Sequence, residues 1–207
     1  MSRDISLRTY IETEILPLYD NFDKAHGRDH ARAVIEQSQS LAEYYDVDRD
    51  MLYAAAAFHD IGLSEGREHH HLSSGRMIRE NRKLREWFTQ EQIETIAQAA
   101  EDHRASSDRE PRTIYGRLIA ESDRLIDPMT VLRRCVQYGL ANHPELNKED
   151  QWERCASHIK SKYGEGGYLK LWIPESPNAQ RLQTLRGIIA DEKRLREIFD
   201  SLYETEI

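Results

Sequence analysis

Residues 54–62 read Ala-Ala-Ala-Ala-Phe-His-Asp-Ile-Gly, and they close a helical segment that we expect to begin near Arg49. The apolar residues that share a helical face with His59 are Leu52, Ala55 and Ala56. Residues three and four apart lie on one face, so the imidazole of His59 points toward the expected core. Asp60 follows directly. Neighbours on a helix point about 100° apart, but both side chains can reach one ion at a helix end.

The same arrangement recurs on three further segments, each of which places one imidazole or carboxylate on an apolar face. These are His30 with Ala33, Val34 and Leu41, His103 with Ile93, Ile96, Ala97 and Ala100, and Asp123 with Ile119 and Ile126. Burying a carboxylate without a partner is costly, and one divalent cation would solve this for Asp60 and Asp123 together. Imidazole and carboxylate ligands suit Mn, Fe, Co, Ni, Zn and Mg to differing degrees.

Each of these residues also has an ordinary explanation when it is taken alone. A single histidine on an apolar face is usually a core histidine with a hydrogen-bond partner, and an inward aspartate often caps a helix or pairs with arginine. Four such faces, together with the adjacent pair His59-Asp60, favour a shared metal site over four separate structural explanations.

The helical period dominates the whole chain of 207 residues, and the scarcity of Gly (10) and Pro (6) argues against a β protein. The fold class is therefore all-α, as one domain over 1–207 with no dividing linker. Thr89 and Gln92 resemble a capping box. A last helix is expected to open at Pro177 and to keep its apolar stripe to Leu202, and no sheet is assigned to residues 168–173. The other expected helices span about 5–19, 28–45, 49–61, 72–84, 89–103, 113–126, 131–140 and 148–162.

Composition excludes several classes of partner. The 29 Lys and Arg against 37 Asp and Glu give a net charge of −8, which disfavours binding to a nucleic acid polymer. No run of 18 apolar residues exists, so no membrane span is expected. Cys135 and Cys155 are too few for a disulfide framework and indicate reduced thiols in a cytoplasmic protein. The oligomeric state is not set by the sequence.

The ordered residues resemble the HD superfamily of metal-dependent phosphohydrolases. The strings that carry the resemblance are His26-Gly-Arg-Asp-His30-Ala-Arg-Ala-Val, Ala-Ala-Phe-His59-Asp60-Ile-Gly, Glu101-Asp-His103-Arg and Ser122-Asp123-Arg124-Leu125. The resemblance implies an HD-domain helical bundle over about residues 20–130, with a divalent metal held by His30, His59, Asp60 and Asp123. Residues 131–207 would form a C-terminal helical extension that these strings do not identify.

The resemblance also gives a role to further histidines, which lie in Glu68-His69-His70-His71-Leu72-Ser73-Ser74-Gly75. Some family members place a histidine four residues before a small residue, and both His70 and His71 satisfy that spacing. His103 matches another extra histidine. Members that carry both can bind a second metal, whereas others use them to hold phosphate. The alternative for the triplet is a solvated loop.

The function implied is hydrolysis of a small phosphate ester or anhydride, for which we favour a nucleotide. A metal lowers the pKa of bound water and neutralises a phosphate oxygen. His70 or His71, with His103, would bind the phosphoryl group or protonate the leaving oxygen, and Arg104 and Arg124 would bind phosphate. Arg124 could instead pair with Glu121 or Asp127. Two other functions stay open, namely a di-iron oxygenase of HD type and a non-catalytic module that binds a metal or a nucleotide.

Overall fold

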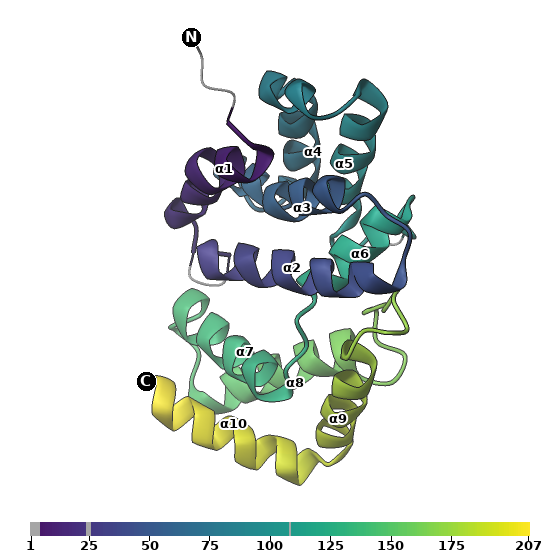
Figure 1. The fold of residues 1–207 in the computed structure, drawn as a ribbon. Coiled ribbons are helices and arrows are strands. Elements are labelled where there is room, and N and C mark those ends of the chain that lie inside the picture. Colours follow the sequence, from purple (N-terminus) through teal and green to yellow (C-terminus); the bar gives the residue numbers. More distant parts are fainter. Residues whose placement is uncertain (1–4, 24–25, 108) are drawn as a thin grey trace. The chain divides into compact units, whose positions relative to one another are not determined.

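The computed structural model describes residues 5–23, 26–107 and 109–207. Its elements are ten α-helices joined by short 3-10 and π turns, and no strand occurs within these ranges (Figure 1). The all-α class is therefore confirmed. Residues 168–173, to which no sheet was assigned, are irregular backbone.

The chain folds as two compact units. The first comprises Met1–Leu125 with Trp172–Ser176, and the second comprises Ile126–Leu171 with Pro177–Ile207. The main segment of the first unit ends at Leu125, close to the end of the HD core that was expected near residue 130. Folding as a single domain stays a prediction, for which one cooperative unfolding transition is the test.

The first unit carries helices α1 to α6. Their bounds, with those of the short turns between them, are α1 Leu7–Tyr10, η1 Ile11–Ile15, η2 Leu16–Asn21, α2 Arg28–Leu41, η3 Ala42–Tyr44, α3 Arg49–Phe58, η4 Ile61–Glu65, α4 His70–Glu80, η5 Arg82–Glu86, α5 Gln90–Asp102 and α6 Ile114–Asp123. The helix expected over 72–84 begins earlier, at His70. It breaks at Asn81, whose side chain accepts a hydrogen bond from the Lys83 N–H.

Side-chain caps and small residues explain where α3 and α5 lie. Asp48 caps α3 by accepting hydrogen bonds from Asp50 N and Met51 N. The expected capping box of α5 is confirmed, with Thr89 and Gln92 bonded reciprocally. In α3 the four alanines at 54–57 are fully buried, and their small side chains let α2, α5 and α6 pack directly around it.

The second unit holds four helices, α7 (Pro128–Asn142), α8 (Lys148–Tyr163), α9 (Asn178–Ala190) and α10 (Glu192–Glu206). The single last helix expected from Pro177 to Leu202 is wrong, because Asp191 divides it. Asp191 has extended backbone (φ −94°, ψ 91°), and its side chain accepts the Arg194 N–H at 3.0 Å, which caps α10. Cys135 and Cys155 are buried in this unit with free thiols.

Residues 172–176 return to the first unit. Ile173 is buried in its core, the Trp172 N–H donates to the Glu121 carboxylate at 2.7 Å, and the Tyr45 hydroxyl donates to Glu175 at 2.6 Å. This short segment, which is distant in sequence, therefore holds α6 through the hydrogen bond to Glu121.

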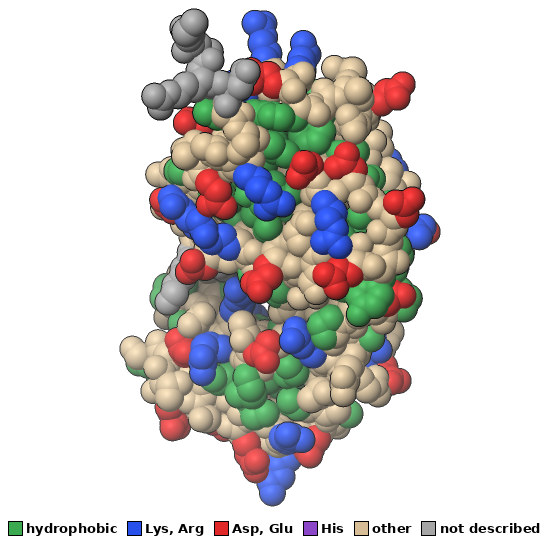
Figure 2. Space-filling model, in the orientation of Figure 1, with side chains coloured by type: hydrophobic (Ala, Val, Ile, Leu, Met, Phe, Trp, Pro, Cys, Tyr) green, Lys and Arg blue, Asp and Glu red, His purple; other side chains and the backbone are tan. Residues whose placement is uncertain are grey.

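On the visible face in Figure 2, acidic and basic side chains are interspersed. Within the described residues, none of the helices is both long enough and apolar enough to cross a membrane.

Candidate metal centre

Three helix ends bring together the first group of ligands. His30 lies in the first turn of α2, His59 and Asp60 directly follow α3, and Asp123 is the last residue of α6. The His30 Nε2 atom lies 3.1 Å from Asp123 Oδ1 and 3.4 Å from His59 Nε2. His59 Nε2 lies 3.2 Å from Asp60 Oδ2. These four residues, which the sequence predicted as ligands, thus point one atom each at a common position.

Asp60 also belongs to a second group, formed with His70 and His103. Its Oδ1 atom lies 3.3 Å from His70 Nε2 and 3.3 Å from His103 Nε2, and those two nitrogens are 3.3 Å apart. His70 is the first residue of α4 and His103 follows the last residue of α5. One carboxylate therefore stands between two sets of imidazoles, with one oxygen directed at each.

Backbone carbonyls orient three of the imidazoles in the same way. The Nδ1 atoms of His59, His70 and His103 lie 2.7, 2.8 and 2.5 Å from the carbonyl oxygens three residues earlier, those of Ala56, Arg67 and Ala100. A carbonyl only accepts, so each Nδ1 carries a proton and each Nε2 is left to bind a cation. This is the second hydrogen bond that metal-binding histidines usually make.

The donor set fits a divalent cation. Ligand atoms about 2.1 Å from one ion are separated by about 3.0 Å at a right angle and about 3.4 Å at the tetrahedral angle. The two Nε2–Nε2 separations of 3.4 and 3.3 Å match that range. Asp60 Oδ1 is buried, yet it is in hydrogen-bonding geometry with neither neighbouring imidazole. A buried acceptor without a donor is costly, and a cation would satisfy it.

The charges of the metal-free cluster compensate one another. Burial lowers the pKa of His59, but the carboxylates of Asp60 and Asp123 outweigh it and raise that pKa to about 9. Burial raises the pKa of Asp60, but the charges of His59 and His103 hold it well below its usual range. The pKa of Asp123 is lowered as well, by His30 against the effect of burial. The proton on His59 therefore balances the negative charge of Asp60 and Asp123, as a bound cation would.

The structure separates the two candidates that sequence spacing left open. His70 contacts Asp60 and His103, whereas His71 contributes to neither ligand group. His71 is half-buried beside His70, with ring centroids 5.7 Å apart. Burial and the charges of His103 and Arg104 lower its pKa to about 4, so its imidazole is neutral near pH 7.

The two arginines expected to bind phosphate form hydrogen bonds to the backbone. Arg104 Nη1 donates to the Glu68 carbonyl at 2.7 Å, which ties the residue after His103 to the loop before His70. Arg124 Nη1 donates to the Ala120 carbonyl on its own helix. Phosphate binding by these two residues stays a prediction.

Close packing fixes the position of His70. Gly62, the last residue of the Ala-Ala-Ala-Ala-Phe-His-Asp-Ile-Gly stretch at residues 54–62, donates its N–H to Ser74 Oγ at 2.9 Å. A Cβ at Gly62 would overlap the His70 carbonyl oxygen and would lie 2.5 Å from Ser74 N. Only glycine therefore lets the turn after Asp60 lie directly against the start of α4.

Ion pairs hold the end of α5, from which His103 projects. The buried carboxylate of Asp102 accepts the Arg112 backbone N–H at 2.8 Å and its Nε at 3.0 Å. Glu101 pairs with Arg79 at 2.5 Å and with Arg112 at 2.6 Å. These contacts link α4, α5 and the start of α6 around the second ligand group.

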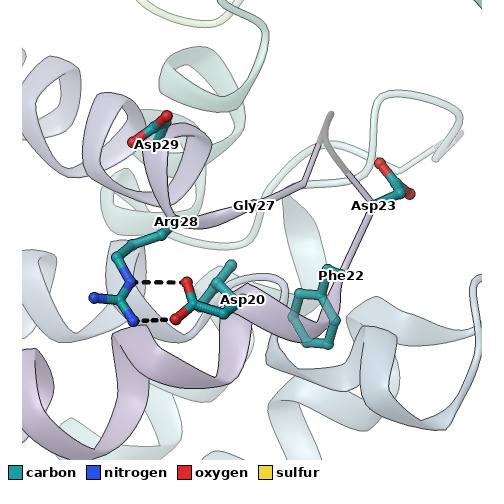
Figure 3. A pocket seen from close by; sticks show the side chains of 7 residues that line it. Asp20, Phe22, Asp23, Gly27, Arg28 and Asp29 are labelled. Atoms are coloured by element: carbon teal, nitrogen blue, oxygen red, sulfur yellow. Dashed lines mark hydrogen bonds and ion pairs between the residues drawn. The ribbon is translucent and has the colours of Figure 1, made fainter.

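Sequence reasoning missed Tyr19, whose hydroxyl contacts the backbone of the His59-Asp60 turn. Tyr19 also lines a pocket of about 440 Å³ between residues 19 and 29 (Figure 3). In that pocket Phe22 lies near the ion pair in which Arg28 Nε donates to Asp20 at 3.0 Å. None of the six clustered ligands lines it. Nothing in the local pattern around Tyr19 signals its role, because its partners are 38 and 41 residues away.

Comparison with known proteins places this cluster in a family. Residues 27–126 match the HD domain. No curated protein is significantly similar to the chain. Among solved structures, a predicted HD superfamily hydrolase from an uncultured Thermotogales bacterium is similar, with 18% identity and a TM-score of 0.49 over 74% of this chain and 90% of that chain. Residues 27–126, which hold all six clustered ligands, are therefore an HD domain.

Proposed function

We propose that this protein is a metal-dependent phosphohydrolase that cleaves a small phosphate ester or anhydride, with a nucleotide as the favoured substrate. The observation that carries the proposal is the position of Asp60, whose two carboxylate oxygens face two separate imidazole groups. Such a set of nitrogen and oxygen ligands holds one cation, or two cations that share a carboxylate.

A divalent cation in such a site supplies an activated water and neutralises a phosphate oxygen. His30, His59, Asp60 and Asp123 are the residues that would hold it. The protein keeps these side chains in place through the Ala56 carbonyl and the ends of α3 and α6, so the ligand atoms are already gathered at one position. Asp123 is the most exposed of the four, at 22%, and marks the side open to substrate.

The role of His70 and His103 depends on how many cations are bound. With one cation, their Nε2 atoms face the shared Asp60, and in the imidazolium form each can donate its Nε2 proton to a phosphoryl oxygen or to the leaving oxygen. With two cations they are ligands. Arg104 directly follows His103, and its guanidinium donates a hydrogen bond to the Glu68 carbonyl in the loop before His70. This guanidinium would bind a substrate oxygen. Arg124 would do the same beside Asp123.

The proposal is tested by phosphate release from a panel of phosphorylated metabolites. The protein is treated with chelator and then supplied with Mn²⁺, Co²⁺, Ni²⁺, Mg²⁺ or Zn²⁺. We expect turnover with at least one metal. Asp60→Ala and Asp123→Ala should lose bound metal and at least about 100-fold in activity, whereas the exposed Asp46→Ala keeps both. A ligand variant with full metal content and full turnover contradicts the assignment.

One observation also favours a second function, a di-iron oxygenase. Two ligand groups that share one carboxylate are what a pair of iron ions would require. Anaerobic purification, iron analysis and oxygen uptake separate the two functions. Oxygen consumption coupled to an organic product, with no phosphate release in any metal, would replace the hydrolase by the oxygenase. Tight binding of nucleotide without turnover would instead indicate a non-catalytic module.

A further inference from the structure

Tyr19 lies at the end of η2, upstream of the residues that match the HD domain, and its side chain is fully buried. Its hydroxyl donates to the Ala57 carbonyl at 2.9 Å and accepts the Asp60 backbone N–H at 3.2 Å. Both partners belong to the turn that presents His59 and Asp60. One hydroxyl group therefore bonds the backbone of Asp60 and that of the last turn of α3, which leads into this ligand pair.

The turn needs this hydroxyl because α3 ends inside the protein. In a continuing helix the Asp60 N–H would bond the Ala56 carbonyl, and the Ala57 carbonyl would accept a bond from Ile61 N–H. Here α3 ends at Phe58, and the Ala56 carbonyl accepts the His59 imidazole instead. Asp60 has left helical geometry, with φ −111° and ψ 3°. In this non-helical conformation its carboxylate faces both imidazole groups.

The ring of Tyr19 is itself held firmly. It packs edge-on against Phe22 with centroids 5.3 Å apart and lies 6.3 Å from the His59 ring. A hydroxyl on a rigid, buried ring is a fixed partner for the turn. The N-terminal segment therefore completes a site whose ligands all come from residues 27–126.

We infer that Tyr19 is a positioning residue for the metal centre, which fixes the backbone of Asp60 so that both carboxylate oxygens are presented to cations. The inference rests on the metal centre of the proposed function. Phenylalanine at this position would keep the packing and remove the hydroxyl, which leaves the Asp60 N–H and the Ala57 carbonyl without their partner.

The test is calorimetric titration of chelator-treated protein with Mn²⁺, and absorption spectroscopy of the Co²⁺-loaded protein. For Tyr19→Phe we expect the Kd for Mn²⁺ to rise by about 10- to 100-fold, the usual effect of losing a residue that orients a ligand. The visible Co²⁺ bands should shift, because the ligand geometry changes.

The matched control is Tyr53→Phe, a buried tyrosine on α3 whose hydroxyl contacts Glu12 at 3.3 Å, away from the cluster. We expect its Mn²⁺ affinity and Co²⁺ spectrum to equal those of the wild type. An equal loss of affinity in both variants would show general loosening of α3 and would overturn the inference. Wild-type affinity and an unchanged spectrum in Tyr19→Phe would overturn it as well.

Two further measurements keep the outcomes apart. Should Tyr19→Phe fail to fold, amide exchange in the wild type decides, because a protected Asp60 N–H is expected and an unprotected one would refute the hydrogen bond. Should the wild type bind neither Mn²⁺ nor Co²⁺, the metal centre of the proposed function fails rather than the role of Tyr19 within it.

Discussion

Asp60 Oδ2 lies 3.2 Å from the imidazole of His59, the residue directly before it, although neighbours on a helix point about 100° apart. The two side chains converge because α3 ends at Phe58, directly before them, and the helical geometry does not continue through Asp60. His59 keeps helical backbone angles, whereas Asp60 does not. The chemistry of the site thus depends on where a helix stops as much as on which residues it carries.

The position of His70 leads to a first prediction. We expect wild-type protein loaded with Mn²⁺ or Fe²⁺ to hold two ions per chain and His70→Ala to hold one, because His70 is one of the three residues of the second group. His71→Ala, at the adjacent position, should keep both. Elemental analysis of the purified variants measures this. Loss of the same ion from His71→Ala would reverse the assignment of the two histidines.

Gly62 provides a second prediction. An alanine there would force its Cβ against the backbone of His70 and Ser74, and backbone cannot move aside as a flexible side chain can. We expect Gly62→Ala to lower the free energy of unfolding by about 2–3 kcal/mol. Urea unfolding at pH 7 measures the loss.

Gly187 is the control for this substitution. It lies inside α9, and a Cβ there meets nothing within 4 Å. Gly187→Ala should therefore stabilise the protein by about 0.5–1 kcal/mol through helix propensity. Equal effects at the two glycines would mean that close packing at Gly62 does not constrain the turn.

The first ligand group could be predicted because helical periodicity carries the information. His30, His59 and Asp123 each lie on an apolar face, and such faces meet in the core of an α-helical unit. The choice between His70 and His71 could not be made from periodicity or spacing. It depends on where α4 begins, and the start of α4 packs against Gly62, a contact between separate segments.

Other features were missed for a different physical reason. The apolar stripe continues on both sides of Asp191, so periodicity alone predicts one helix where the capping carboxylate of Asp191 makes two. The contacts of Tyr19 join residues 38 and 41 positions apart, and local patterns contain no information about such pairs. A local cap decides where α9 ends and α10 begins, and a tertiary contact decides the partner of the buried Tyr19 hydroxyl.

Glu94 should make stability depend on pH. Hydrogen bonds from Arg79 are the main cause that lowers the pKa of Glu94 to about 2. A depressed carboxyl pKa stabilises the folded protein above the unfolded value of about 4.3, and the contribution is lost as pH falls toward about 2. Because the side chain is 42% exposed, solvent screening reduces the contribution, which we expect to be about 1 kcal/mol.

Glu94→Gln is the variant that tests this. It should cost about 1 kcal/mol at pH 7 and almost nothing near pH 2, as measured by urea unfolding across the range. The exposed Glu36→Gln on α2 should change stability by less than about 0.5 kcal/mol at pH 7. A cost of Glu94→Gln that is the same at pH 7 and pH 2 would exclude the ion pair with Arg79 as its source.

Metal removal should destabilise the first unit, because its ligands come from α2, α3, α4, α5 and α6 and a bound cation ties these helices together. A ligand at 100 times its Kd stabilises the folded state by about 2.7 kcal/mol. For a chain of this length that corresponds to a rise in Tm of about 5–10 °C on adding Mn²⁺ to chelator-treated protein. Asp123→Ala, which removes one ligand of the first group and leaves the second group intact, should show a smaller rise, and Asp46→Ala should match the wild type. A rise of equal size in Asp123→Ala would mean that Mn²⁺ binds elsewhere on the protein.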